Sequence, residues 1–320
     1  MKPSPEYIQP RPVKTVFGLI DHMLLGVTDA HNHVWIEAVA GAESAAPVLD
    51  EEEKIIEELR SYRADGGTSL LDCQLRGSGR NGNMLARLAT QSGVNLIACK
   101  GFHRRKYYPP EYRLFTASET KIAEHFISEY TTALEECQDE EVAVRAGFIK
   151  IALEVDWKEI PQAALEATAA AAFETGALIA IHTEKGLLAE KAILYFDNQH
   201  IKPHQLVLCH MDKRPDFGLH SEIARFGTLL EYDTFFRPKY EPETRLWPLL
   251  FDMLAYGFDD SIALATDMAE KEMYTSIGKG PGLASLPREI SARLSRANQS
   301  DDVIRQLIGG NISRRLAGLT

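Results

Sequence analysis

The chain has 320 residues, 45% of them hydrophobic, so it can bury the core of one α/β barrel, a fold that commonly takes about 250 residues or more. Its formal net charge of −11 argues against non-specific binding to nucleic acid or to an anionic membrane. The segment after Met1 lacks the apolar stretch of a secretory signal, and no uncharged apolar run approaches the roughly 18 residues of a membrane span. We therefore expect a soluble cytoplasmic protein.

Short apolar or β-branched runs alternate along the chain with longer amphipathic segments, which is typical of repeated βα units around a parallel sheet. Eight of these runs are almost continuously hydrophobic, as expected of strands covered on both faces. They span residues 27–33, 68–74, 95–103, 148–154, 178–184, 206–212, 228–234 and 262–268. The sequence thus predicts an α/β fold, a single (β/α)8 TIM barrel formed by residues 1–320 as one domain, with a short N-terminal extension before the first barrel strand.

Helix signals lie between several of these runs. Asp50 is expected to cap a helix over 51–62, and a helix over 163–175 is expected to end at Gly176. The segment 118–137 has the pattern of an added or lengthened helix between the third and fourth strands. The four cysteines lack CxxC spacing, and three lie in apolar runs, so we expect reduced thiols and neither disulfides nor a cysteine-zinc site; they are Cys73, Cys99, Cys137 and Cys209.

Two histidines, His31 and His33, close the first predicted strand. Strand alternation places side chains i and i+2 on one face, so both imidazoles point toward the same place. Neutral imidazole is a good ligand for zinc and related metals. The alternative is a pair of polar loop histidines, and further polar residues at the ends of later strands make that alternative weaker.

Those further residues are Lys150, His182, His210 and Asp267. Barrel enzymes carry their catalytic groups at the carboxyl ends of the strands. A lysine inside an apolar strand is rarely buried unless it is paired or chemically altered, and a carbamate on the Lys150 amine would make it a bridging carboxylate. An ordinary ion-paired lysine, and a helix-capping role for Asp267, are the alternatives. Bound metals acidify water and polarise a carbonyl or phosphoryl group, so the set predicts a binuclear metal hydrolase with Asp267 as its catalytic carboxylate.

The loops after the predicted strands contain many cations, although the chain is acidic. A positive mouth would attract an anionic substrate, whereas the alternative is that these side chains are merely solvated. Asp267, Lys271 and Tyr274 are spaced i, i+4 and i+7, so a short helix would place all three on one side. The glycine-rich segment 278–282 is a lid or a turn, and it has no Walker-type spacing. The loop cations are Arg76, Arg80, Arg104, Arg105, Lys106, Arg237 and Lys239.

With these motifs the chain resembles the phosphotriesterase-like members of the amidohydrolase superfamily over nearly its whole length. The resemblance rests on LGVTDAHNH at 25–33, AGFIK at 146–150, IHT at 181–183, HQLVLCHMD at 204–212 and NISRRL at 311–316. It implies that one metal is bound by His31, His33 and Asp267, and the other by His182 and His210. It also implies that carboxylated Lys150 bridges the two ions.

Two departures from the family pattern bear on the substrate. Asn32 stands where many relatives have Glu, and its side chain is expected to point away from the metals. Thr234 follows Asp233 where phosphotriesterases tend to have a histidine proton shuttle, so aryl phosphotriesters are not expected as the main substrates. The loops are similar to the branch that hydrolyses phosphorylated sugar lactones, which implies that Lys239, Lys271 and Tyr274 contact the phosphate. Arg76 and Arg237, from the basic loops, are the other candidate substrate contacts.

The sequence therefore predicts a lactonase that opens an anionic, phosphorylated sugar lactone by attack of metal-bound hydroxide, with Asp267 delivering the proton to the departing ring oxygen. A phosphotriesterase or other ester hydrolase at the same metal centre is the alternative, and a non-catalytic binding barrel is a third. Two divalent ions are expected, zinc first, although manganese, cobalt or iron suit the same ligands. We expect a small-molecule substrate and no nucleic-acid or membrane partner, and a homo-oligomer is left open.

Overall fold

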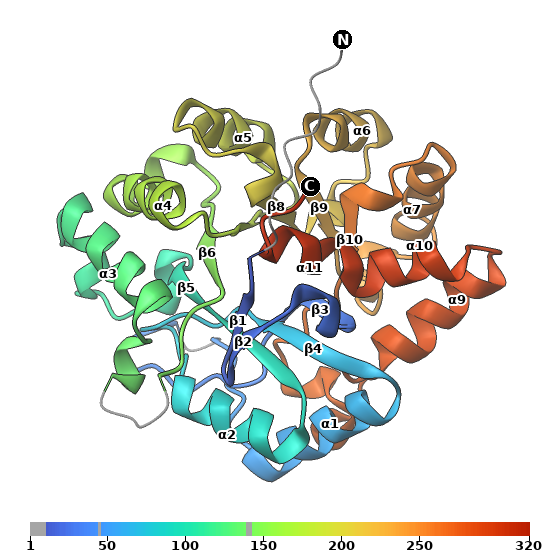
Figure 1. The fold of residues 1–320 in the computed structure, drawn as a ribbon, viewed down its shortest axis with the longest axis horizontal. Coiled ribbons are helices and arrows are strands. Elements are labelled where there is room, and N and C mark those ends of the chain that lie inside the picture. The colour runs from blue at the N-terminus through green and yellow to red at the C-terminus, as the bar shows by residue number, and fades with distance from the viewer. Residues whose placement is uncertain (1–10, 44–45, 139–142) are drawn as a thin grey trace.

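A computed structural model describes residues 11–43, 46–138 and 143–320 of the chain. Eight parallel strands pair in the order in which they occur along the chain and curve into a barrel (Figure 1). This confirms the predicted (β/α)8 TIM barrel. The strands are β3 (Val27–Asn32), β4 (Gly67–Asp72), β5 (Asn95–Phe102), β6 (Phe148–Ala152), β7 (Ile179–His182), β8 (Leu206–Cys209), β9 (Leu229–Tyr232) and β10 (Ile262–Leu264).

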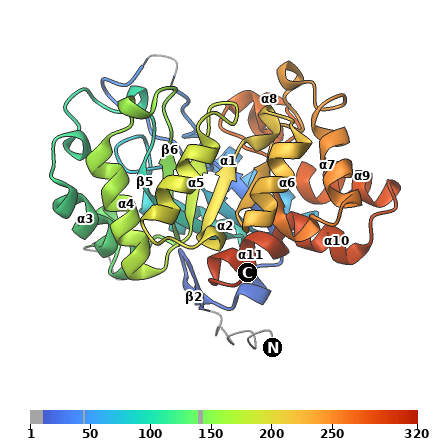
Figure 2. The same ribbon diagram turned by 90° about the horizontal axis from the view of Figure 1, so that it is seen from above.

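Helices surround the barrel (Figure 1), and a short antiparallel hairpin of β1 (Val13–Thr15) and β2 (Gly18–Ile20) lies near α11 at one end of it (Figure 2). No helix of the described residues is both long enough and apolar enough to cross a membrane. The α-helices are α1 (Glu52–Ala64), α2 (Gly82–Ser92), α3 (Glu119–Thr131), α4 (Gln162–Thr175), α5 (Ala189–Asn198), α6 (Phe217–Phe226), α7 (Leu246–Ala255), α8 (Thr275–Gly278), α9 (Ser291–Arg296), α10 (Asp301–Arg305) and α11 (Asn311–Leu316).

The helix predictions had mixed outcomes. α4 ends as expected, with Gly176 in the left-handed conformation that glycine adopts easily. Asp50 does not cap α1, because the helix starts after Glu51 without a side-chain cap. The Asp50 carboxylate contacts Lys271 instead. The predicted helix over 118–137 is shorter, since α3 ends at Thr131.

Main-chain and side-chain hydrogen bonds close the barrel between β10 and β3. The main-chain N–H of Asp267 donates to the carbonyl of His31 at 3.0 Å. The Thr266 hydroxyl donates to the Asp29 carboxylate at 2.6 Å, and the Asn32 amide donates to that hydroxyl at 2.7 Å. The Asn32 side chain therefore lies in this seam and points away from the predicted metal ligands, as expected.

The glycine-rich segment after α8 is a turn packed on main chain. The N–H groups of Gly278 and Gly280 both donate to the carbonyl of Tyr274, and that of Gly282 donates to Met273. A Cβ on Gly278 would lie 2.2 Å from the Cα of Glu272, so this position has no room for a side chain. In the structure the segment is thus a tight turn.

Candidate metal centre

Strand alternation aims the predicted ligands into the barrel. Phe148 and Ala180 belong to the apolar cluster inside the barrel, and Lys150 and His182 follow them two residues later on the same strand face. Asp267 lies beyond the end of β10, where its φ of 45° turns the chain. Five of the six predicted ligands are buried, and His182 is partly buried.

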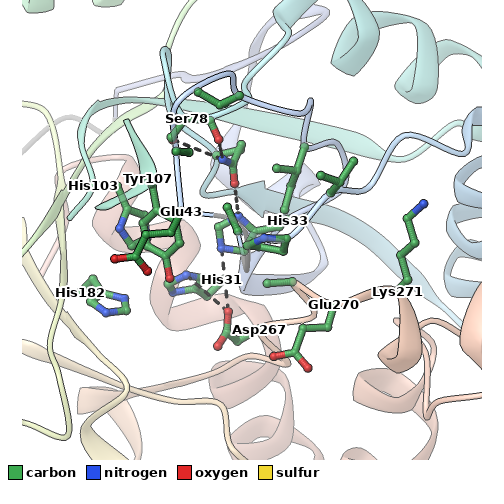
Figure 3. A pocket seen from close by; sticks show the side chains of 18 of the residues that line it. His31, His33, Glu43, Ser78, His103, Tyr107, His182, Asp267, Glu270 and Lys271 are labelled. Carbon is green, nitrogen blue, oxygen red and sulfur yellow. Dashed lines mark hydrogen bonds and ion pairs between the residues drawn. The ribbon is translucent and has the colours of Figure 1, made fainter. Parts of the chain in front are cut away.

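The structure brings the six predicted ligands together, and Figure 3 shows His31, His33, His182 and Asp267 among them. The Lys150 amine lies 2.8 Å from His31 Nε2, and His210 Nε2 lies 2.8 Å from His182 Nδ1. A carboxylate oxygen of Asp267 is 3.9 Å from Nε2 of both His31 and His33. Ligand atoms of His31, His33 and Asp267 all lie within 4.8 Å of one another, a spacing that suits one metal ion.

Three further side chains form hydrogen bonds to the Nδ1 nitrogens of His31, His33 and His210. Nδ1 of His31 contacts Glu231 at 2.8 Å, Nδ1 of His210 contacts Asp233 at 2.5 Å, and Nδ1 of His33 contacts the Gln74 oxygen at 2.7 Å. Partners of this kind fix the tautomer so that Nε2 is left to bind a metal. The sequence analysis missed Glu231 and Gln74 and considered Asp233 only for its neighbour. The signal available was the Glu-x-Asp alternation at 231–233 in an apolar strand, which follows the interior residue Leu229.

His31, His210, Glu231 and Asp233 are also close enough together to hold a metal. Because both carboxylates contact Nδ1 nitrogens, we interpret them as groups that orient the histidines.

The electrostatics of the site suit a group of positive charge. Burial lowers the pKa of His33 to about 4 and the pKa of His31 and His210 well below the usual value, so these rings are neutral and ready to ligate. Burial and the neighbouring Asp233 raise the pKa of Glu231 well above its usual value. Glu231 Oε2 and Asp233 Oδ1 are buried without a hydrogen-bond partner. A nearby cation would favour the ionised form of Glu231.

Lys150 lies fully buried in this cluster. Within the described residues no carboxylate oxygen lies within 4.0 Å of its amine, and its hydrogen bond is to His31. A buried ammonium without a carboxylate partner is costly, whereas a carbamate on the same atom would be a carboxylate ligand. The donor set of neutral imidazoles, carboxylates and a modifiable amine therefore fits two divalent ions.

A cavity of about 740 Å³ opens above these residues. Of the predicted substrate contacts, Arg237, Lys239 and Lys271 line it. Arg76 lies outside it, 3.6 Å from Glu135. Tyr274 is fully buried, and its hydroxyl donates to the carbonyl of His33.

The predicted helix from Asp267 to Tyr274 is wrong. Asp267 has a φ of 45°, and only a three-residue 3-10 turn, Lys271–Met273, is helical there. Lys271 points away from Asp267 (Figure 3), and its amine pairs with Asp50 at 3.1 Å and with Glu51 at 2.8 Å.

A predominantly basic mouth is also not what the structure shows. Arg80 is buried and bonded to Glu129 and Glu136, and Arg104 is paired with Glu154 and Glu184. The cavity itself is lined by four Lys or Arg side chains and five Asp or Glu side chains. Most cations of the predicted rim are thus neutralised by carboxylates far away in the sequence.

Two lysines of the cavity remain without such partners. The amines of Lys213 and Lys239 lie 5.4 and 5.2 Å from the ring centre of Tyr240, and within the described residues neither has a carboxylate within 4.0 Å. Although burial disfavours the ammonium, Asp233 and Asp267 raise the pKa of Lys213, so its amine stays protonated. The sequence analysis missed Lys213, which its position three residues after His210 would have indicated.

Comparisons with known proteins identify a family, relatives and a similar fold. The model of the phosphotriesterase family matches residues 11–315. An N-acetyltaurine hydrolase of Danio rerio is 27% identical to the chain, covering 91% of it and 95% of that protein. A phospho-furanose lactonase of Mycoplasmopsis synoviae is 24% identical, covering 95% and 91%. The solved structure of a lactonase from Listeria monocytogenes has the same fold, with a TM-score of 0.87, 23% identity, and coverage of 95% of this chain and 98% of that one.

Proposed function

The chain belongs to the phosphotriesterase family, and from that premise we propose that it is a binuclear metal-dependent lactonase acting on a phosphorylated sugar lactone. The observation that carries the proposal is the convergence of six predicted ligands below a cavity that also contains two unpaired lysines. The lactone is suggested by the Mycoplasmopsis synoviae relative, which is named a phospho-furanose lactonase.

In this proposal His31, His33 and Asp267 hold one ion and His182 and His210 hold the other, with carboxylated Lys150 between them. When bound, the ions acidify a water molecule and polarise the carbonyl that it attacks. Zinc is our first choice, and manganese, cobalt and iron suit the same ligands. A cytoplasmic location and assembly into homo-oligomers stay predictions.

Asp267 is the group that moves the proton. Burial alone would raise its pKa, but the cations Arg237 and Lys213 hold the pKa below its usual range, so the carboxylate is ionised at neutral pH. Arg237 also fixes its position, with an Nη2 to Oδ2 distance of 3.3 Å. Asp267 is therefore placed to accept the proton of the attacking water and to deliver it to the departing ring oxygen.

The anionic group of the substrate is assigned to the side of the cavity that contains Lys213 and Lys239. Arg237 is retained as a contact, although it already binds Asp267 and Glu270. Lys271 would have to exchange its carboxylate partners for the substrate. Tyr274 and Arg76 are given no direct role, because the first holds the main chain of His33 and the second lies outside the cavity.

Amide hydrolysis is a second candidate function. Several relatives are named N-acetyltaurine hydrolases, and the one from Danio rerio covers 91% of this chain. An N-acylated amino sulfonate is also a small anion with a carbonyl carbon to be attacked, so the same ligands and lysines suit it. A phosphotriester lacks the charge that Lys213 and Lys239 would bind.

Turnover of four compounds by metal-loaded protein tests these assignments. The compounds are a γ-lactone phosphate, the same lactone without phosphate, N-acetyltaurine and an aryl phosphotriester. We expect the lactone phosphate to have the highest kcat/KM, about 10- to 100-fold above the neutral lactone, as expected for one or two charged hydrogen bonds. Preferred turnover of N-acetyltaurine would establish the second candidate, and turnover of the phosphotriester alone would refute both.

A further inference from the structure

His103 lies just beyond β5, lines the cavity and contacts the predicted ligand His182, with 5.1 Å between ring centres (Figure 3). Its Nδ1 accepts a hydrogen bond from the main-chain N–H of Arg104 at 2.7 Å. In a neutral imidazole the hydrogen must then be on Nε2, which makes Nε2 a donor. Within the described residues this donor has no partner.

Tyr107 offers a second donor beside it. The two rings meet edge to face with 4.5 Å between centres, Tyr107 also lines the cavity, and its hydroxyl has no hydrogen-bond partner among the described residues. The segment that carries both side chains is held in place by its main chain. The N–H of His103 donates to the Tyr108 hydroxyl at 2.8 Å, and the carbonyl of Lys106 accepts from Glu43 at 3.1 Å.

This wall of the cavity is the segment 103–107, of which His103 and Tyr107 line the cavity, whereas its Lys and Arg side chains do not. The Lys106 amine lies 4.9 Å from the centre of the Tyr107 ring, outside the lining. The guanidinium of Arg104 is occupied by Glu154 and Glu184, and the loop that packs on the segment adds the acidic side chain of Glu43 to the lining. Because Nδ1 of His103 accepts the N–H of Arg104, it carries no proton and the ring is uncharged. Uncharged donors are suited to hydroxyl and ether oxygens.

The barrel topology places this wall across from the unpaired lysines. β5, which precedes His103, and β9, which precedes Lys239, are four positions apart in a barrel of eight strands, so their ends face each other across the mouth. Lys213 follows the adjacent strand β8. The ligand cluster lies between the two sides. A substrate over the metal centre therefore meets cations on one side and neutral donors on the other.

We propose that His103 Nε2–H and Tyr107 O–H bind hydroxyl oxygens of the substrate and thereby select a polyhydroxylated lactone. This inference rests on the proposed function for the lactone, and it names two residues that determine specificity. The anionic group then lies at Lys213 and Lys239, and the hydroxyl groups lie at His103 and Tyr107.

The test compares the lactone phosphate with its analogue lacking the ring hydroxyl groups. Tyr107→Phe removes one donor and keeps the ring. His103→Asn keeps an acceptor for Arg104 N–H but loses the Nε2 donor, whereas His103→Gln retains an amide donor near the Nε2 position. We expect Tyr107→Phe and His103→Asn to lower kcat/KM about 10- to 100-fold for the hydroxylated lactone and less than about 3-fold for the deoxy analogue, with partial rescue in His103→Gln.

Exposed Tyr256 supplies the matched control, since Tyr256→Phe should change neither value. Metal content, measured in every variant, should remain that of the unaltered protein. Equal losses with both lactones, or no loss with either, would overturn the inference.

A binding measurement separates this inference from the proposed function. The probe is a hydroxylated tetrahydrofuran phosphate, which has no carbonyl to attack, titrated calorimetrically into metal-loaded protein. We expect Tyr107→Phe to weaken its binding about 10-fold and to leave the deoxy probe unaffected, even if the unaltered protein turns over no lactone. Failure of the unaltered protein to bind the probe would refute the assignment of this wall.

Discussion

At the scale of single residues, the Nδ1 nitrogens of the histidines matter as much for metal affinity as the Nε2 nitrogens that are left to bind the metal. Replacing Glu231 by Leu removes the acceptor for His31 Nδ1, so the ring loses the contact that fixes its tautomer. We expect metal affinity to fall about 10- to 100-fold, and to fall less in Glu231→Gln, which keeps an oxygen there. Titration of cobalt or zinc against a competing chelator measures this.

The control for that experiment is Glu222→Leu, on an exposed position of α6. Its metal affinity should equal that of the unaltered protein. If Glu231→Leu bound metal as tightly as Glu222→Leu, Glu231 would have no role in positioning His31.

A separate prediction concerns Lys150. As a metal ligand it should favour activity, whereas as a buried charge it should destabilise the metal-free protein. Lys150→Met removes the bridging group but fills the same space without a charge. We expect fewer than two metals per chain by elemental analysis and a loss of about 10³-fold in kcat/KM, equal to about 4 kcal/mol of barrier. The melting temperature of the metal-free protein should not fall, because the substitution removes a buried ammonium that has no carboxylate partner. Full metal content in this variant would refute the bridging role.

At the scale of elements, Arg80 joins the loop after β4 to α3. It is buried and bonded to Glu129 on α3 and to Glu136 in the turn that follows. Arg80→Leu leaves a buried carboxylate without its partner, so we expect a loss of about 3–5 kcal/mol in the free energy of unfolding at neutral pH. Urea denaturation measures this loss.

The same variant has a defined pH dependence. Although burial opposes it, Arg80 lowers the pKa of Glu129 and Glu136 below the ordinary value of 4.5. Their stabilising effect is complete above pH 4.5 and is lost as the pH falls through the lowered values. Without Arg80, burial raises the pKa of Glu129. Glu129 then takes up a proton on acidification, and the buried carboxylate no longer destabilises the variant. The difference in the free energy of unfolding between the unaltered protein and Arg80→Leu should therefore become smaller as the pH falls. A difference that did not change with pH would contradict this account.

The sequence predicted the barrel because each strand is a continuous apolar run, but it predicted the strand ends less well. β8 and β10 end at Cys209 and Leu264, before the predicted limits, and beyond these ends His210 and Asp267 have φ values of 64° and 45°, outside the strand conformation. Those turns aim polar side chains into the site. The apolar pattern does not mark these turns, because apolar residues continue past the point where the strand pairing stops, as Met211 follows His210 and Met268 follows Asp267.

The six ligand candidates could be found from sequence because a polar residue in an apolar strand, or shortly after one, is a local property. The substrate contacts could not be found in the same way, since the availability of a cation depends on its partners. Arg80 and Arg104 are neutralised by Glu129 and Glu184, which are 49 and 80 residues away along the chain. Lys213 has no such partner, and nothing in its local sequence shows that.

At the scale of the whole molecule, long-range and short-range electrostatics have opposite signs for an anionic substrate. The chain has a formal net charge of −11, and acidic side chains slightly outnumber cations in the cavity lining. At an ionic strength of about 0.01 M this charge is felt over about 30 Å, whereas at about 0.15 M it is screened beyond about 8 Å. Contact with Lys213 and Lys239 is made at much shorter range.

We therefore expect kcat/KM for the lactone phosphate to rise about two- to five-fold as the ionic strength increases from about 0.01 to about 0.15 M, because screening removes the repulsion before it weakens the contacts. The neutral lactone, the control substrate, should show no change. Lys213→Gln should raise KM for the lactone phosphate at every salt concentration. In this variant kcat/KM should still rise with ionic strength. A kcat/KM that fell steeply with salt would show that a positive field steers the substrate, which the distribution of charges in this cavity does not predict.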